Sequence, residues 1–455
     1  MNQCKVFVPF GALGAGISQE AFDRGMALGP DIISTDAGST DSGPYYLGTG
    51  KGKYADAVLR RDMTQLMLAA DEKGIPITVG TAGTCGSDLG VDTLAQICRE
   101  IAAEHHLQKK IACIYTQQDA AVLKQKYRQG KIIPLHGAPE ITETVFDECT
   151  TIVALAGVEP FIKALREGAD IVLCGRATDT AVIAACPILK GCDAAASWHA
   201  AKTAECGCLC TTNPRDGGVF LTIDEAGFTV EATDPESSCT PYSVSAHMLY
   251  ENADPVRLTE PGVVIDTTHA VYTQLENGRV RVEGTRLEKR PYTMKLEGSS
   301  PAGYQTISLV GIQDRDIMKD PVRWLGSLAA YVEGKLLKMG LEKEKDYHYT
   351  LKPYGYNAVS GRPVPDGYVP NELGILLTVT ADTQQRATQV AKVFNPYLLH
   401  FPVHLNRQLP SFAFPLSPAE TERGLLYAFR LYHVVELDDP LELCRMTTEL
   451  IGKEG

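Results

Sequence analysis

The segment DIISTDAGSTDSGPYY, residues 31–46, places two acids and several hydroxyl groups directly after an apolar run. Asp36 ends that run and Asp41 follows five residues later, with Ser39 and Thr40 between them. Asp36 alone could cap a helix, but Asp41 lies too far along the chain to cap the same helix end. Two carboxylates in one site can hold a divalent cation or can separate a general acid from a general base.

Three other glycine-bearing loops also follow apolar runs, namely GALGAG (11–16), GTAGTCGSD (80–88) and GRATDT (175–180). Glycine at one such turn is often only steric, but four similar loops predict a common site lined by backbone N–H groups. Arg176 could form a plain ion pair with Asp179, although an arginine at a strand end also suits a substrate carboxylate. The candidate substrate-binding residues are Gly14, Gly16, Asp36, Ser39, Thr40, Gly83, Arg176 and Asp179.

The segment SWHAAKTAECGCLC (197–210) carries a second set of reactive side chains. If it is helical, His199, Lys202 and Cys206 share one face, with Glu205 beside them. A polar stripe of this kind could transfer protons, whereas a lone histidine is more often a buried structural residue. The candidate catalytic residues are therefore His199, Asp41, Lys202 and Glu205.

The metal requirement stays open at this stage. Asp36 and Asp41 would be the ligands if a divalent ion such as Mg²⁺ is bound. Cys206, Cys208 and Cys210 stand at alternate positions, whereas metal-binding cysteines usually come as C-x-x-C pairs, so reduced thiols are the default interpretation. The run HMLYENADP (247–255) forms a further polar cluster without an assigned role.

The first half of the chain alternates strands that are apolar throughout with amphipathic helices. Six strands are predicted, at residues 4–10, 31–36, 75–83, 109–116, 131–135 and 169–175. This alternation is typical of a parallel sheet covered on both faces, and six strands are too few for a (β/α)₈ barrel. Loops at the carboxyl ends of such strands meet at one edge, which is where ligands bind.

The later segments follow other patterns. Runs such as GVFLTIDEAGFTVEA and an Asn-Gly turn at residues 277–278 predict antiparallel hairpins. We therefore expect an α/β fold with an N-terminal doubly wound, mostly parallel sheet, followed by an antiparallel β-rich region and a C-terminal α+β domain. The predicted domains are residues 1–212, 213–320 and 321–455.

Composition excludes several classes of protein. The 455 residues include 43 Lys and Arg against 56 Asp and Glu, and the resulting net charge of −13 disfavours nucleic acid. No apolar stretch reaches the roughly 18 residues that span a bilayer. Thirteen cysteines, several inside predicted strands and helices, fit a reducing compartment. We expect a cytoplasmic protein that does not bind membranes.

Familiar nucleotide motifs fit poorly. GALGAG opens a helix after the first strand, and Asp36 stands twenty residues beyond Gly16, as in dinucleotide binding. The spacing is G-x-x-G-x-G, however, instead of G-x-G-x-x-G. A nicotinamide-dependent oxidoreductase therefore stays an alternative. No G-x-S-x-G elbow occurs, which disfavours a serine hydrolase.

Several longer runs resemble the acyclic terpene utilisation AtuA family. They are DAGSTDSGPYYLGTGK, GVEPFIKAL, GADIVLCGRATDTA, WHAAKTAECG, AHMLYENADP and YTMKLEGSSPAGYQTISLVGI. The resemblance extends from about residue 5 to 315 and is weaker beyond. The motif positions that it covers are Asp36, Asp41, Gly175, Arg176, Asp179, His199, Lys202, Glu205 and Cys206, while Cys208 and Cys210 lie outside it.

The resemblance implies a lyase or hydratase step on a small branched carboxylate or a carboxylated acyl-CoA. Such enolate-type chemistry needs a base, an oxyanion stabiliser and a cation for the remote carboxylate. His199 or an aspartate would be the base, loop N–H groups or a divalent ion would stabilise the oxyanion, and Arg176 or Lys202 would bind the carboxylate. We expect a homo-oligomer, with a small partner subunit as a further option. A noncatalytic ligand-binding subunit of a larger enzyme is the third alternative.

Overall fold

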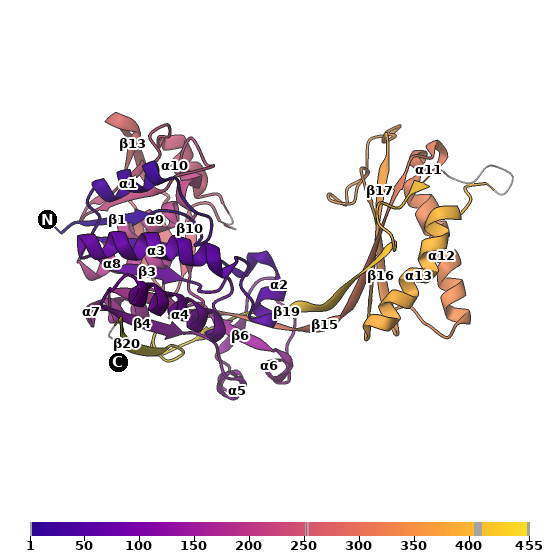
Figure 1. The fold of residues 1–455 in the computed structure, drawn as a ribbon, viewed down its shortest axis with the longest axis horizontal. Coiled ribbons are helices and arrows are strands. Elements are labelled where there is room, and N and C mark those ends of the chain that lie inside the picture. The colour runs from indigo at the N-terminus through magenta and orange to yellow at the C-terminus, as the bar shows by residue number, and fades with distance from the viewer. Residues whose placement is uncertain (1, 251, 253, 405–411, 453–455) are drawn as a thin grey trace. The chain divides into compact units, whose positions relative to one another are not determined.

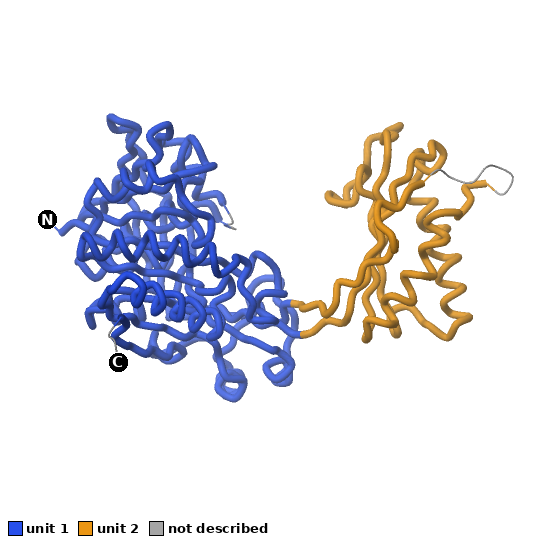
Figure 2. The backbone as a smooth tube through the Cα atoms, in the orientation of Figure 1, with its two compact units in different colours: residues 1–300, 429–455 blue, residues 301–428 orange. Residues whose placement is uncertain are grey.

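A computed structural model describes residues 2–250, 252, 254–404 and 412–452. The chain forms two compact units, Met1–Ser300 with Phe429–Gly455, and Pro301–Ala428 (Figure 2). The expected boundaries near residues 212 and 320 do not separate these units. The reason is that the strands between residues 219 and 283 complete the sheet of the first unit, to which the chain also returns after residue 428.

A ten-stranded mixed sheet organises the first unit, in the order β12-β13-β9-β8-β1-β2-β3-β7-β4-β20 (Figure 1). Neighbouring strands pair in parallel through its centre. The parallel strands are β1 (Cys4–Val8), β2 (Ile32–Asp36), β3 (Ile77–Gly80), β7 (Ile171–Cys174) and β4 (Lys109–Tyr115). The predicted strand at 131–135 is not part of this sheet. It forms β5 (Ile132–Pro134), a strand of half-buried and exposed residues that pairs antiparallel with β19 (Glu420–Glu436).

Helices cover both faces of the central strands, as predicted from the apolar strands. Side chains alternate along each strand, so that Val6 faces one hydrophobic core and Phe7 faces the other. The Phe7 core is covered by α1 (Gln19–Ala27), α3 (Asp56–Lys73) and α4 (Asp88–Glu104). The Val6 core is covered by α7 (Glu159–Arg166), α8 (Asp179–Leu189) and α9 (Ala194–Ala204).

This arrangement creates a topological switch point between β3 and β7. The two strands are parallel neighbours, yet β3 leads into α4 on one face and β7 leads into α8 on the other. Loops that depart in opposite directions leave a crevice at the carboxyl ends of the strands, where ligands bind in open α/β sheets.

Antiparallel strands extend the sheet at both edges. One edge adds β8 (Val219–Ile223), β9 (Gly227–Ala232), β13 (Arg279–Glu283) and β12 (Val271–Leu275), and the other adds β20 (Arg445–Ile451). A separate three-stranded sheet contains β10 (Arg257–Glu260), β11 (Val263–Asp266) and β14 (Arg286–Lys289). The shorter elements of this unit are η1 (Thr40–Ser42), α2 (Pro44–Thr49), α5 (Ala120–Arg128), α6 (Val145–Glu148), β6 (Thr151–Ala154), η2 (Gly207–Cys210), α10 (Pro241–His247) and η3 (Glu276–Gly278).

The second unit is an antiparallel sheet packed against helices. Its strands are β16 (Tyr347–Tyr354), β17 (Leu373–Ala381), β18 (Phe412–Ala413), the later part of β15 (Thr293–Ile312) and the first part of β19. Apolar residues on one sheet face share a core with α11 (Arg315–Lys319), α12 (Pro321–Lys338) and α13 (Gln384–His400). No helix within the described ranges is both long enough and apolar enough to cross a bilayer.

Candidate functional site

The four glycine-bearing loops converge at the carboxyl edge of the parallel strands, as predicted. Backbone hydrogen bonds join them in series: Leu13 N donates to Asp36 O (2.7 Å), Ala37 N donates to Gly80 O (2.9 Å) and Thr81 N donates to Gly175 O (2.9 Å). The longest of these contacts joins residues 94 positions apart, Thr81 and Gly175, so only the tertiary structure brings the loops together.

Close packing between the loops accounts for several of the glycines. A Cβ atom on Gly86, whose φ is +70°, would lie 2.1 Å from Arg176 N, far inside van der Waals contact. A Cβ atom on Gly83 would lie 2.5 Å from the Cα atom of Gly90 in α4. Gly83 was predicted to bind substrate, but here it lets a loop approach a helix.

Two backbone N–H groups of the GALGAG loop form hydrogen bonds to a side chain of the protein itself. Gly14 N and Gly16 N both donate to Asp62 Oδ2, at 2.9 and 3.2 Å. The Asp62 side chain is only 1% exposed, and it also pairs with Arg61. A buried carboxylate therefore occupies the place that a phosphate would take in a dinucleotide-binding loop, so Gly14 and Gly16 are not available to an anionic ligand.

Arg176 lies at the switch point, where protein groups surround it. Its Nε atom donates to Glu297 Oε2 at 3.0 Å, and Nη1 lies 3.3 Å from Thr81 Oγ1 and 3.5 Å from Asp179 Oδ1. Glu297 also pairs with Lys295 Nζ at 3.0 Å, and these two cations hold the pKa of Glu297 at about 2 despite its burial. The Arg176–Glu297 pair is thus ionised and buried.

Two aspartates next to Arg176 have raised pKa values. Burial raises the pKa of Asp36 well above its usual range, the charge of Asp179 adds to this, and Arg176 opposes it. Asp36 Oδ2 accepts a hydrogen bond from Gly38 N at 3.0 Å. Burial also raises the pKa of Asp179, while the positive charges of Arg176 and Lys202 lower it. The Asp179 side chain is 34% exposed, so solvent screens part of the effect of burial.

A second charged group joins the end of α9 to the start of α8. Lys202 Nζ donates to Glu205 Oε1 at 2.5 Å. Thr180 Oγ1 lies 2.5 Å from Glu260 Oε1 and 3.4 Å from Glu205 Oε2, so it connects the two carboxyl groups. Burial raises the pKa of Glu205 to about 8. Lys202 and Glu205 are therefore neighbours, as the helical spacing predicted.

The loop after β2 folds into a short 3₁₀ turn, η1. Ser39 Oγ donates to Asp41 Oδ2 at 2.8 Å and accepts from Asp41 N at 3.2 Å. Thr40 is buried, whereas Asp41 is exposed and contributes to the raised pKa of Asp179. Asp41 thus lies at the margin of the charged cluster and Asp36 lies inside it.

His199 does not join Lys202 and Glu205. Its ring is fully buried, with Nδ1 2.7 Å from Thr285 Oγ1 and Nε2 3.2 Å from the Tyr272 hydroxyl. Its ring packs edge-on against Phe228, and burial lowers the pKa of the imidazole to about 3. The histidine has the environment of a satisfied core residue, which was the structural alternative considered from the sequence.

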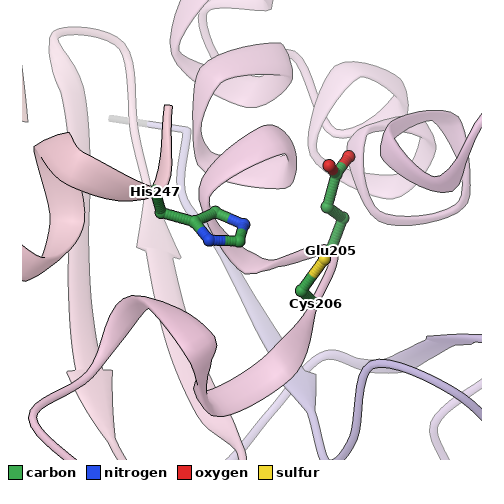
Figure 3. Close-up of side chains that lie close together, drawn as sticks. All are labelled: Glu205, Cys206 and His247. Carbon is green, nitrogen blue, oxygen red and sulfur yellow. The ribbon is translucent and has the colours of Figure 1, made fainter. Parts of the chain in front are cut away.

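The three alternate cysteines do not converge. Helix α9 ends at Ala204, and Cys208 and Cys210 lie in the 3₁₀ helix η2, where side chains two positions apart point in different directions. The Cys210 thiol lies 3.6 Å from Gly207 O. Across the described chain, the one group of three clustered metal-ligand side chains is instead Glu205, Cys206 and His247 (Figure 3). Glu251, in the same polar run as His247, lies outside the described residues.

A cavity of about 1030 Å³ adjoins this end of α9. The GALGAG loop lines it together with Cys206, Cys208 and two cations, Arg61 and Arg215. Two acids, Asp62 and Asp216, also line it, and Arg61 pairs with Asp62, so the cavity carries charges of both signs close to the Glu205–Cys206 segment.

Sequence reasoning missed four residues of these networks, Asp62, Glu260, Glu297 and Lys295. Glu297 carried no signal in the sequence, because TMKLEGSS alternates polar and apolar residues and places it on what would be the polar face of a strand, whereas the structure buries it. Its partner Arg176 is 121 residues away, so nothing in the local pattern indicates the pairing.

Comparison with known proteins agrees with the resemblance seen in the motifs. The profile of the acyclic terpene utilisation family protein AtuA matches residues 47–411, which extends the likeness well beyond residue 315. No curated protein and no solved structure matches the chain. Because the matched range covers most of its length, the chain belongs to the acyclic terpene utilisation AtuA family.

Proposed function

We propose that the protein is a lyase or hydratase that acts on a small branched carboxylate or a carboxylated acyl-CoA by enolate-type acid/base chemistry. The observation that carries this proposal is the Asp179 carboxyl group, which is partly exposed beside buried Arg176 at the switch point of the sheet. Ligands bind at such points, and carboxyl groups with shifted pKa values there are candidates for proton transfer.

Asp179 is the proposed general acid or base. Elimination of water takes a proton from the carbon next to a carbonyl and returns a proton to the leaving hydroxyl group. Burial raises the pKa of the Asp179 carboxyl, which brings its protonated and ionised forms closer in free energy and suits a group that both takes up and releases a proton. Asp179 replaces His199 in this role, since the imidazole is fully buried between Thr285 and Tyr272.

Arg176 and Lys202 have different proposed roles. Arg176 is the proposed positioning residue: Glu297 holds its guanidinium in place, and the guanidinium in turn holds Asp179. Lys202 is the proposed cation for a substrate carboxylate, because its charge acts on Asp179. In the adjacent cavity, which Asp62 and Asp216 also line, Arg215 is the arginine proposed to bind a carboxylate or a coenzyme A phosphate, because Arg61 already pairs with Asp62.

The alternative of a nicotinamide-dependent oxidoreductase is not favoured. Its motif depended on the N–H groups of Gly14 and Gly16, which donate to Asp62. A noncatalytic subunit is the alternative that an experiment must separate from our proposal.

The first experiment is a thermal-shift screen of the full chain with branched di- and tricarboxylates and their coenzyme A thioesters. A ligand that binds the native state raises the melting temperature. Hits are then assayed for loss or gain of water or of a carbon–carbon bond. Binding without turnover, restored by a second purified chain, would favour the noncatalytic subunit.

The variant that tests the site is Asp179→Asn, with Asp224→Asn as its control at the opposite edge of the sheet. Each aspartate is partly exposed and pairs with an arginine, which for Asp224 is Arg281 at 2.8 Å. We expect kcat to fall by at least about 100-fold for Asp179→Asn and to stay unchanged for Asp224→Asn. Equal activity in both variants would exclude Asp179 as the proton-transfer group.

A further inference from the structure

We propose that Glu205, Cys206 and His247 bind a thiophilic divalent cation, for which Zn²⁺ is the best fit. The three residues come from two parts of the fold: Glu205 and Cys206 follow α9, and His247 ends α10. Figure 3 shows the His247 imidazole pointing from α10 toward the Glu205–Cys206 segment. This proposal names other ligands than Asp36 and Asp41, the pair expected from the sequence if a divalent ion is bound.

The distances suit a single ion. One ligand atom from each residue lies within 4.8 Å of the other two. Ligand atoms around tetrahedral zinc are roughly 3.5 Å apart, given bonds of about 2.0–2.3 Å. Binding therefore requires these atoms to approach one another by up to about 1 Å.

An independent observation at His247 also points to a ligand. The residue is 6% exposed, and no hydrogen-bond partner for its Nε2 atom is present in the described parts of the chain. A buried polar atom without a partner costs roughly 1–3 kcal/mol. Tyr250 stacks on the ring at 5.7 Å, which fixes the direction in which the nitrogens point. A metal ion beside the ring would satisfy this nitrogen.

The donor set indicates which metal. Thiolate sulfur and imidazole nitrogen are ligands of zinc and related transition metals, whereas Mg²⁺ prefers oxygen. One thiolate and one carboxylate together carry the two negative charges that a divalent ion requires, and the ammonium of Lys202, which bonds to Glu205, adds one positive charge beside them. Three protein ligands leave a fourth position open, as in catalytic zinc sites.

A ligand could reach the open coordination position through the cavity of about 1030 Å³, because Cys206 also lines that cavity. If the proposed lyase or hydratase activity is correct, the ion would polarise the substrate oxygen on which negative charge develops. Metal binding itself does not depend on that activity.

Cobalt titration of the full chain tests the site. Co²⁺ substitutes for Zn²⁺, and a thiolate ligand produces a charge-transfer absorption band. We expect one equivalent per chain to give this band, and Zn²⁺ to abolish it by displacement. Cys206→Ser should remove the band, and His247→Ala should weaken Zn²⁺ affinity by at least about 100-fold in competition with a chelating dye.

Cys208→Ser is the matched control, because Cys208 lies two residues away and lines the same cavity. It should keep both the band and the affinity. Native tryptophan fluorescence of each variant shows that it is folded. Absence of stoichiometric binding in the parent protein, or equal loss in Cys206→Ser and Cys208→Ser, would overturn the proposal. Stoichiometric zinc with no turnover on any carboxylate would instead count against the proposed reaction alone.

Discussion

Replacing His199 by glutamine should change the pH dependence of stability, and it should do so without removing a catalytic group. Glutamine retains one amide that can reach the Tyr272 hydroxyl, but it leaves the Thr285 hydroxyl without its partner at 2.7 Å. We expect the variant to be about 1–3 kcal/mol less stable than the parent at about pH 7, where the imidazole is neutral in both states.

The size of the pH effect follows from the pKa of the buried ring. Burial lowers it from 6.5 to about 3, so between these values the unfolded chain binds a proton that the folded chain does not. This contribution to stability is complete above pH 6.5 and is lost as the pH falls toward 3. Each pH unit costs about 1.4 kcal/mol, so the parent loses about 2 kcal/mol by about pH 5.

The variant lacks the titrating group, whereas the other ionisable groups are common to both proteins. The stability difference between parent and His199→Gln should therefore shrink by about 2 kcal/mol between about pH 7 and about pH 5.

Urea denaturation can isolate the relevant unit, because the chain has only two tryptophans. Trp198 precedes His199 in α9 and is 2% exposed, while Trp324 belongs to α12 in the other unit. In a Trp324→Phe background, fluorescence reports on the unit that contains His199. A stability difference that stays constant between the two pH values would refute the inference that His199 is held neutral by burial.

Two further variants test the buried charges. Arg176→Ala should destabilise the same unit by about 3–5 kcal/mol, because the buried carboxylate of Glu297 loses the guanidinium that it pairs with. Arg176→Met combined with Glu297→Gln removes both charges and should recover part of this loss in the same urea assay. Asp62→Asn should lower the free energy of unfolding by about 1–3 kcal/mol, because it weakens the hydrogen bonds that Gly14 N and Gly16 N donate to Asp62. Calorimetry should show no gain in the affinity for a dinucleotide; tighter binding would show that the loop serves a cofactor.

Local patterns were sufficient for most of the fold. Apolar runs alternating with amphipathic helices predicted the parallel strands, and their carboxyl ends predicted the edge where the loops meet. The strand at 131–135 was misplaced because a short run carries no information about its partner. It pairs with β19, about 300 residues later in the chain.

The candidate site could also be predicted only in part from the sequence. Glycines, aspartates and the Arg176 loop were identified because turn residues after strands have a recognisable composition. Their roles were not, since a glycine that approaches another backbone and a glycine that binds an anion look alike in sequence. His199 and His247 show this most clearly. Both are buried, but the ring nitrogens of His199 lie within hydrogen-bond distance of hydroxyl groups, whereas Nε2 of His247 lacks a partner in the described chain and its ring lies near a thiol and a carboxyl group.

The sequence by itself determined the secondary structure of the α/β core, the edge of the sheet that carries the reactive side chains and the family to which the chain belongs. Only the tertiary structure decided which charges are paired, which amides are used internally and which side chains form a common site. The physical reason is that helix and strand periodicity depends on neighbours a few residues away, whereas burial and ion pairing depend on groups that the chain brings together from distant positions.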